Sequence, residues 1–172
     1  LVATLDNILI GCDGVFLAIN TMLYTLGKYP DVQIKMRKEI KEQLEGRHLT
    51  INDRKRLPYC EAVIMEVQRL CAQSGFGAPH QAEEDVRVHE FVIPAGYDVF
   101  PNMYHVLHDP KYWDEPHEFK PERFLDADGK CVVNPRWIPF ELGQRMCPGR
   151  NFAMDILALL TERLVSEFVI TT

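Results

Sequence analysis

The segment from Pro58 to Cys71 constrains the fold of this chain most, because it predicts a helix that is apolar almost all round. A helix without a polar face must be enclosed by the rest of the protein, so we expect it to be buried. Glu66 and Arg69 stand within this apolar background, three residues apart and therefore on one face, where they can form an ion pair. Both charges need partners, because burying an unpaired charge costs several kcal/mol.

The other patterns predict a mainly α-helical chain with a small β-sheet. A long apolar run indicates a helix over 1–26, and apolar residues at every fourth position indicate a second helix over 31–46. Thr50 to Asp53 is a start signal for a short helix. Pro148 opens a last helix, whose predicted apolar face consists of Phe152, Ile156, Leu157, Leu160 and Leu164.

Between these helices the periodicity changes. Val86 and Val88 alternate with charges, and two strand-like runs on either side of 94–96 predict a β-hairpin. The segment 109–121 has three prolines and no periodicity. We expect it to be an ordered meander, because its aromatic residues favour burial: Tyr112, Trp113 and Phe119.

Composition limits the function. The 172 residues are enough for one domain or for part of a larger one, and a net charge of −6 without a basic block argues against nucleic-acid binding. The five cysteines form no C-x-x-C pair and are odd in number, which indicates reduced, cytosol-facing thiols. The longest apolar run is broken by Asp13 and is too short to span a bilayer. The first residues enter a helical pattern without a capping residue, so we expect this chain to be part of a longer protein.

The stretch F-E-L-G-Q-R-M-C-P-G-R at 140–150 carries the strongest chemical signal. Cys147 directly precedes a predicted helix, whose unpaired N–H groups and positive dipole end stabilise a thiolate, the form that ligates metals. Arg145 could reach an anionic group on whatever the thiolate binds. A lone cysteine is more often a small buried hydrophobe, but here five fixed positions occur together. These positions are Phe140, Gly143, Arg145, Cys147 and Gly149.

The five positions match F-x-x-G-x-R-x-C-x-G, and the stretch resembles the cysteine-ligand loop of the cytochromes P-450, the haem-thiolate monooxygenases. The resemblance covers residues 1–172 and has the character of the animal microsomal branch. It implies the C-terminal, haem-binding portion of a single larger domain. It also implies haem b (iron protoporphyrin IX) as the cofactor, with Cys147 as the axial ligand of the iron.

The buried helix carries the family's E-x-x-R motif, and K-P-E-R-F downstream resembles a later motif of the family. The resemblance implies that Glu66, Arg69 and Arg123 form a structural charge triad that braces the cysteine loop. The alternative for the E-x-x-R pair alone is an ordinary pair on the surface, because most Glu and Arg side chains are exposed.

The resemblance also implies the residues that hold the haem. His80 of A-P-H and Arg145 would hold the haem propionates, and Phe140 belongs to the same cofactor-binding loop. His80 alone would more often be a plain structural histidine. His105 and His108 could be two zinc ligands, but no Cys or carboxylate stands at metal-ligand spacing from them.

An acid interrupts the apolar run I-L-I-G-C-D-G-V-F-L-A-I at 8–19, which resembles the A-G-x-[DE]-T of the family's distal helix. Gly11 would let the backbone approach the porphyrin, and Asp13 would be the acid of the proton-delivery pair. A carboxylate in an apolar wall is a functional-site candidate. The alternative is an aspartate that faces water on an amphipathic helix. Gly14 stands where the family has its oxygen-activating Thr, so this position offers no hydroxyl.

Two more positions depart from the family's pattern. Glu141 occupies a place usually held by a small residue, and Gln144 replaces a common basic residue on the face where a reductase docks.

The resemblance implies a haem-dependent monooxygenase that inserts one atom of dioxygen into a small apolar substrate, such as a steroid, fatty acid, terpenoid or xenobiotic. Electrons would come from a flavoprotein of the NADPH-cytochrome P-450 reductase type. The protein would lie on the cytosolic face of the endoplasmic reticulum membrane, held by an amino-terminal anchor outside this chain. Two alternatives stay open: a truncated or diverged non-catalytic relative, and, given Gly14, a member that uses or rearranges a peroxide.

Overall fold

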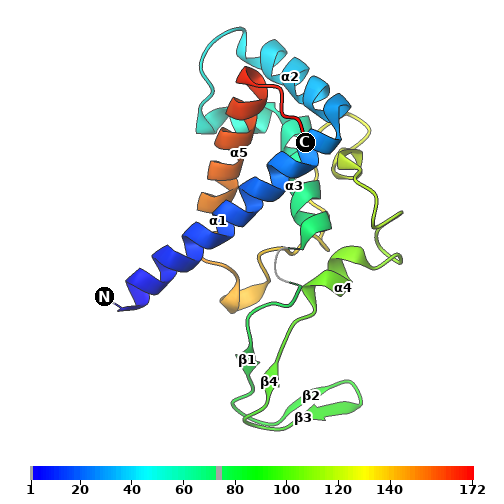
Figure 1. Ribbon diagram of the computed structural model, residues 1–172. Helices are drawn as coiled ribbons and strands as arrows, with labels where there is room; N and C mark the ends of the chain where they lie inside the picture. The colour runs from blue at the N-terminus through cyan, green and yellow to red at the C-terminus, as the bar shows by residue number, and fades with distance from the viewer. Residues whose placement is uncertain (1, 73–74) are drawn as a thin grey trace.

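The computed structural model describes residues 2–72 and 75–172, and side chains from residue 11 onward. Helices pack around α3 (Pro58–Cys71), and two short β-sheets extend from one end of the molecule (Figure 1). This is the predicted mainly α-helical architecture with a small β component. α3 has the predicted bounds, and most of its residues between Cys60 and Arg69 are buried.

The long helices α1 (Val2–Lys28), α2 (Pro30–Leu44) and α5 (Arg150–Glu167) all contact α3. The predicted four-residue spacing in α2 is confirmed by its buried apolar residues: Val32, Met36, Ile40 and Leu44. The short 3-10 helix η1 (Ile51–Arg56) begins with the capping box that Thr50 and Asp53 predict. Local sequence signals therefore set the bounds of these helices well.

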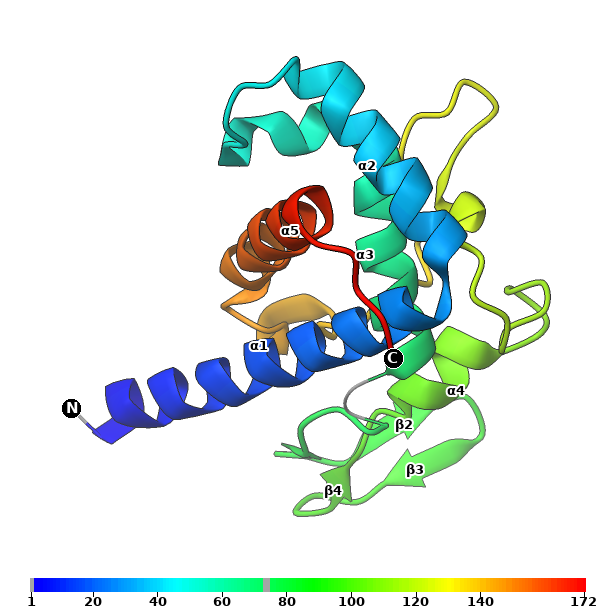
Figure 2. The same cartoon turned by 45° about the horizontal axis from the view of Figure 1, so that its top comes forward.

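α1 is only partly enclosed. Ala18, Met22 and Leu26 are buried, whereas residues 11–14 are exposed, and the N-terminal half of the helix projects from the body (Figure 2). Phe16 is 69% exposed although it lies in the most apolar run of the chain.

Within residues 2–72 and 75–172, no helix combines the length and the apolar character that crossing a membrane requires. All five cysteines are free thiols, as their odd number and spacing predict.

The predicted hairpin is displaced. β2 (Val86–Val88) pairs antiparallel with β3 (Phe91–Ile93) across a turn at 89–90, so the hairpin lies before 94–96 rather than around it. β3 ends where Pro94 follows, because proline has no N–H to extend the ladder.

A second sheet joins strands that are distant in the sequence. β4 (Asp98–Val99) pairs antiparallel with β1 (His80–Gln81), and the turn between β3 and β4 is fastened by the Gly96 N–H, which donates to the Ala82 carbonyl at 2.7 Å. The two strand-like runs around 94–96 therefore belong to different sheets.

The segment after α4 (Met103–His108) is an ordered meander that runs into the 3-10 helix η2 (Pro121–Phe124). Trp113 and Phe119 are buried as predicted, but the predicted burial of Tyr112 is wrong. The Arg136 guanidinium lies 3.8 Å from the centre of the Tyr112 ring and covers it instead, as a cation–π contact at the surface.

α5 buries a different face from the predicted one. It begins at Arg150, two residues after Pro148, and Phe152 and Leu160 are exposed. Successive side chains of a helix point about 100° apart, so the apolar residues of α5 cannot all face the core at once. The buried side chains are Met154, Leu157, Ala158, Thr161, Glu162 and Val165.

Glu162 is the unexpected member of this buried face. Its side chain is completely enclosed, and neither carboxyl oxygen has a hydrogen-bond partner among the described residues. Its pKa is raised from 4.5 to about 8, chiefly by burial and also by the nearby Glu61 and Glu39 carboxylates, against the opposing effect of Arg54. Glu162 is therefore protonated in the fold at neutral pH.

A pKa that is raised by folding makes stability fall as pH rises from the unfolded value to the folded one. We expect the complete protein to lose on the order of 2–4 kcal/mol more stability between pH 5 and pH 8 than its Glu162→Gln variant, which cannot ionise. Urea unfolding across this pH range measures the difference. The exposed Glu42→Gln is the control, and equal pH profiles for wild type and Glu162→Gln would contradict the prediction.

Candidate functional site

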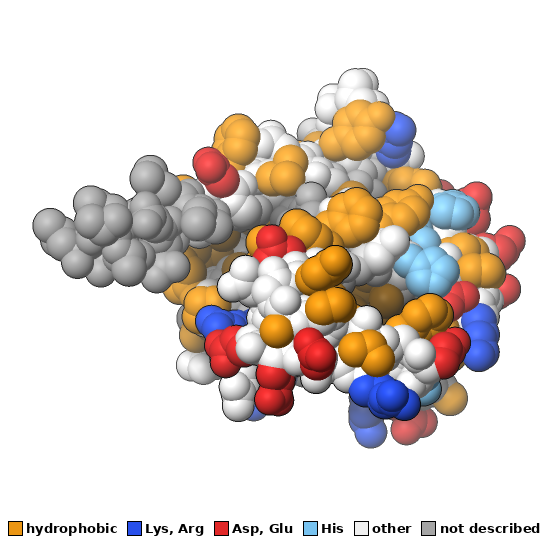
Figure 3. Space-filling view, turned by 90° about the horizontal axis from the view of Figure 1, so that it is seen from below, with side chains coloured by type: hydrophobic (Ala, Val, Ile, Leu, Met, Phe, Trp, Pro, Cys, Tyr) orange, Lys and Arg blue, Asp and Glu red, His pale blue; other side chains and the backbone are white. Residues whose placement is uncertain are grey.

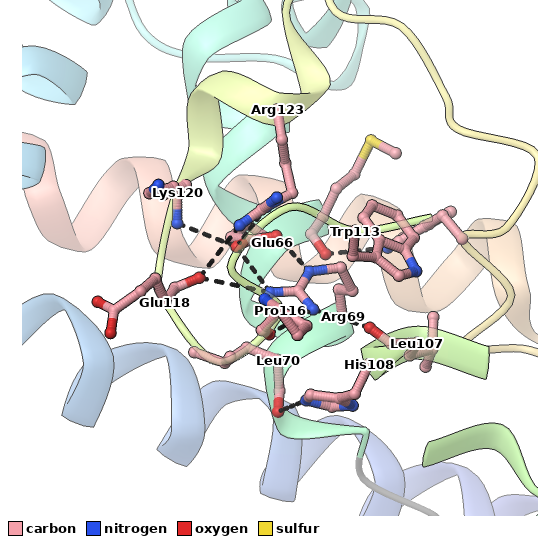
Figure 4. Close-up of polar contacts among 12 residues, drawn as sticks. Glu66, Arg69, Leu70, Leu107, His108, Trp113, Pro116, Glu118, Lys120 and Arg123 are labelled. Carbon is pink, nitrogen blue, oxygen red and sulfur yellow. Dashed lines mark hydrogen bonds and ion pairs between the residues drawn. The ribbon is translucent and has the colours of Figure 1, made fainter. Parts of the chain in front are cut away.

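A fully buried ion pair lies in the C-terminal half of α3 (Figure 4). Arg69 Nε donates to Glu66 Oε2 at 2.7 Å, and Arg69 Nη2 donates to Glu66 Oε1 at 3.0 Å. The E-x-x-R pair is therefore bidentate and buried, not a surface pair. Its geometry is that of a strong charge-assisted contact.

The remaining donors of Arg69 join α3 to distant backbone. Arg69 Nη1 donates to the carbonyls of Leu107 in α4 and Pro116 in the meander, each at 2.8 Å. The guanidinium also lies 5.1 Å from the centre of the Trp113 ring. One side chain therefore fastens three segments together.

Arg123 completes the cluster from η2. Its Nε donates to Glu66 Oε1 at 2.9 Å, and its Nη1 donates to the Asp114 carbonyl at 2.9 Å. The Lys120 backbone N–H donates to the same Glu66 oxygen at 3.0 Å. The structure thus brings together Glu66, Arg69 and Arg123, and their burial leaves them placed to brace the fold rather than to meet a substrate.

Trp137 connects this cluster to the cysteine loop (residues 140–150). The sequence analysis did not predict this role of Trp137. Its indole N–H donates to the Met65 carbonyl in α3 at 2.9 Å, and its ring meets Phe140 edge to face at 6.2 Å. The Phe140 carbonyl in turn accepts the Cys147 N–H at 2.9 Å. The available signal was a large aromatic residue within an irregular segment, where burial is favoured.

Cys147 lies between the 3-10 helix η3 (Gly143–Arg145) and α5, and it is exposed. It lies shortly before the N-terminus of the 18-residue helix α5, which begins at Arg150. Leu142 and Met146 in the same loop are exposed apolar side chains, and Arg145 is also exposed. In Figures 1 and 2 the loop runs alongside the middle of α1.

The donor set around Cys147 fits a haem better than a bare metal ion. Among the described residues, no three His, Cys, Asp or Glu side chains gather as a metal site. A single exposed thiolate suits an iron that a porphyrin already holds. His108 is no zinc ligand here, because its two ring nitrogens lie 3.0 and 3.1 Å from the carbonyls of Tyr104 and Leu70.

His80 already has a carboxylate beside it in this structure. Its Nε2 lies 3.3 Å from Glu141 Oε2, so the Glu141 carboxylate of the cysteine loop is its polar neighbour. The sequence marked Glu141 as a departure from the family's pattern but did not predict this contact.

Gly11, Asp13 and Gly14 lie on the exposed half of α1. Asp13 is exposed, and this part of the helix projects from the body (Figure 2). The apolar side chains that precede it, at 8–10, lie outside the described side chains. A Cβ at Gly11 or Gly14 would meet no described atom within 4 Å, so α1 has room for a side chain at both positions.

Comparison with known proteins matches residues 1–172 to the cytochrome P450 family. The chain is 40% identical to cytochrome P450 2B4 of Oryctolagus cuniculus over 147 residues, 84% of this chain and 30% of that protein. It is 36% identical to cytochrome P450 2K6 of Danio rerio over 172 residues, 99% of this chain and 34% of that protein. It is 38% identical to cytochrome P450 2S1 of Homo sapiens over 159 residues, 90% of this chain and 32% of that protein. The chain thus spans about a third of the length of these relatives.

Removing Glu66 leaves Arg69 buried without its counter-ion. We expect Glu66→Ala to destabilise the complete protein by about 3–5 kcal/mol, as measured by urea unfolding, and to lower its haem content. Glu122→Ala is the matched control, because Glu122 pairs with Lys35 at the surface and such a pair contributes about 0–1 kcal/mol. Normal stability and haem content with only turnover lost would contradict a bracing role.

Proposed function

The chain belongs to the cytochrome P450 family, and from this premise we propose that the complete protein is a haem-thiolate monooxygenase. It inserts one atom of dioxygen into a small apolar substrate. The observation that carries the proposal is Cys147, an exposed thiol before the N-terminus of α5, in a loop fastened to the braced helix α3.

Haem b, when bound, supplies the oxygen-activating iron, and the protein supplies its ligand and surroundings. Cys147 would hold the haem iron, and its thiolate would supply the electron density that activation of dioxygen needs. The Phe140 carbonyl, which accepts the Cys147 N–H at 2.9 Å, holds the backbone that carries the sulfur. Gly149 leaves the space beside the sulfur unfilled, where a Cβ would lie 3.9 Å from Cys147 Sγ.

Arg145 and His80 hold the two haem carboxylates, with Arg145 exposed beside the cysteine and His80 at the start of β1. The bracing of α3 by Glu66, Arg69 and Arg123 keeps the loop in place, through the Trp137 contact with Met65.

Exposed apolar side chains line the remaining surroundings. Phe16 and Leu17 on α1 and Leu142 in the loop present apolar surface to a cofactor and an apolar substrate. Further apolar side chains gather on the face seen from below (Figure 3). Asp13 delivers protons during oxygen activation, and the open space beside Gly14 admits a water that substitutes for a side-chain hydroxyl.

The electron donor is a flavoprotein of the NADPH-cytochrome P-450 reductase type, and the protein works on the cytosolic face of the endoplasmic reticulum. Both parts of the proposal rest on the similarity to animal cytochromes P450. A member that uses or rearranges a ready-made peroxide is the second candidate, and Gly14 favours it because such a reaction needs no hydroxyl relay.

Cys147→His tests the ligand assignment in the complete protein. We expect the red-shifted Soret band of the reduced carbon-monoxide complex to disappear, because imidazole is not a thiolate. Cys12→Ser, which removes another exposed thiol, should leave the band unchanged. Survival of the band in Cys147→His would refute the assignment.

Gly14→Thr tests the proton relay. Positioned acid–base help of this kind is typically worth about 10²–10⁴-fold, so the hydroxyl should raise the product formed per reductant consumed. Substrate affinity should change little, because the position is open and exposed. If coupling is already high with Gly14 and Thr does not improve it, the relay argument is wrong for this protein.

A further inference from the structure

Glu141 reaches from the cysteine loop to a segment 63 residues earlier in the chain. Its Oε1 accepts the Ala78 backbone N–H at 2.6 Å, and its Oε2 lies 3.3 Å from His80 Nε2. The carboxylate is only 16% exposed. When His80 Nε2 carries a proton, Ala78 and His80 form a carboxylate seat of two donors for one carboxylate, and the chain's own side chain fills it.

Both sides of this contact are built for close approach. A Cβ at Gly77 would meet Glu141 Oε1, so Glu141 can stay in the seat only while position 77 is glycine. The Gly77 N–H donates to the Pro101 carbonyl at 2.8 Å, which holds the segment in place without Glu141. Glu141 itself has a φ of +62°, a left-handed conformation that residues with side chains rarely adopt.

The contact matters because the seat accepts a carboxylate and haem carries two. Resting on the proposed function, in which His80 holds a haem propionate, we propose that Glu141 competes with that propionate for the carboxylate seat. Two negative charges at hydrogen-bonding distance repel each other, and the donors of the seat satisfy only one of them.

Haem binding therefore requires Glu141 to leave the seat or to remain beside a second negative charge. Where Glu141 leaves, the apparent affinity for haem falls to the fraction of molecules in which the seat is free. Where it stays, the repulsion between the two carboxylates weakens the bound state. When haem is lost, Glu141 returns and holds the cysteine loop against residues 77–80. Glu141 thus acts as a positioning residue that weakens haem retention and preserves the loop.

The rate of haem transfer from the complete holoprotein to excess apomyoglobin tests the competition. Glu141→Ser removes the competing carboxylate, so we expect haem loss to slow by about tenfold, because the bound propionate then has no negative neighbour to repel it. Glu141→Gln keeps an oxygen that accepts the Ala78 N–H but carries no charge, and it should also slow haem loss. Glu84→Gln alters an exposed acid before β2 and should leave the rate unchanged.

A double variant gives an independent readout. His80→Gln should accelerate haem loss more in the Glu141→Ser background than in wild type, because only there is His80 free for the propionate. Equal acceleration in both backgrounds would contradict the competition. An unchanged or faster haem loss from Glu141→Ser and Glu141→Gln would also overturn it. Glu141 would then have no effect on haem binding, or would only hold the cysteine loop against residues 77–80.

Failure of the proposed function would look different. The complete protein would then carry no thiolate-ligated haem in any variant, wild type included, and this inference would fall with it. Thiolate-ligated haem that is lost at one rate regardless of residue 141 would overturn the inference alone.

Discussion

The fold depends on one buried carboxylate. Glu66 accepts hydrogen bonds from two guanidinium groups and a backbone N–H, which come from α3, from η2 and from the residue before it. Because the two arginines also donate to carbonyls of α4 and the meander, irregular backbone that would otherwise need water is satisfied inside the protein. The charges are stable there only as a set, so the segments that supply them must assemble together.

The cysteine loop inherits its position from this assembly. The loop has little regular structure, and its attachment to α3 runs through the Trp137 indole and the Phe140 ring. A loop held by aromatic packing can present an exposed sulfur without burying it. The contacts with α3 hold the loop in place, and the position of Cys147 in the loop leaves its sulfur exposed.

The sequence predicted best where information is local. The bounds of α3, the spacing in α2 and the capping box at η1 follow from patterns within a few residues. The buried face of α5 did not follow, because apolar residues surround that helix and only its neighbours decide which side is enclosed. The pairing of β1 with β4 and the contact of Glu141 with His80 join distant segments, and no local pattern encodes them. Among the site residues, the E-x-x-R motif and the family resemblance predicted the cluster of Glu66, Arg69 and Arg123. The only signal for Trp137 was the general preference of tryptophan for burial.

The close approach of Gly77 and Glu141 has a consequence for residue 77 itself. A Cβ at position 77 would meet the far end of the Glu141 side chain, which can rotate away. A side chain at 77 would therefore turn the glutamate out of its place beside Ala78 without disturbing the backbone. The size of one residue in this segment thus decides whether the Ala78 N–H is covered by the chain's own carboxylate.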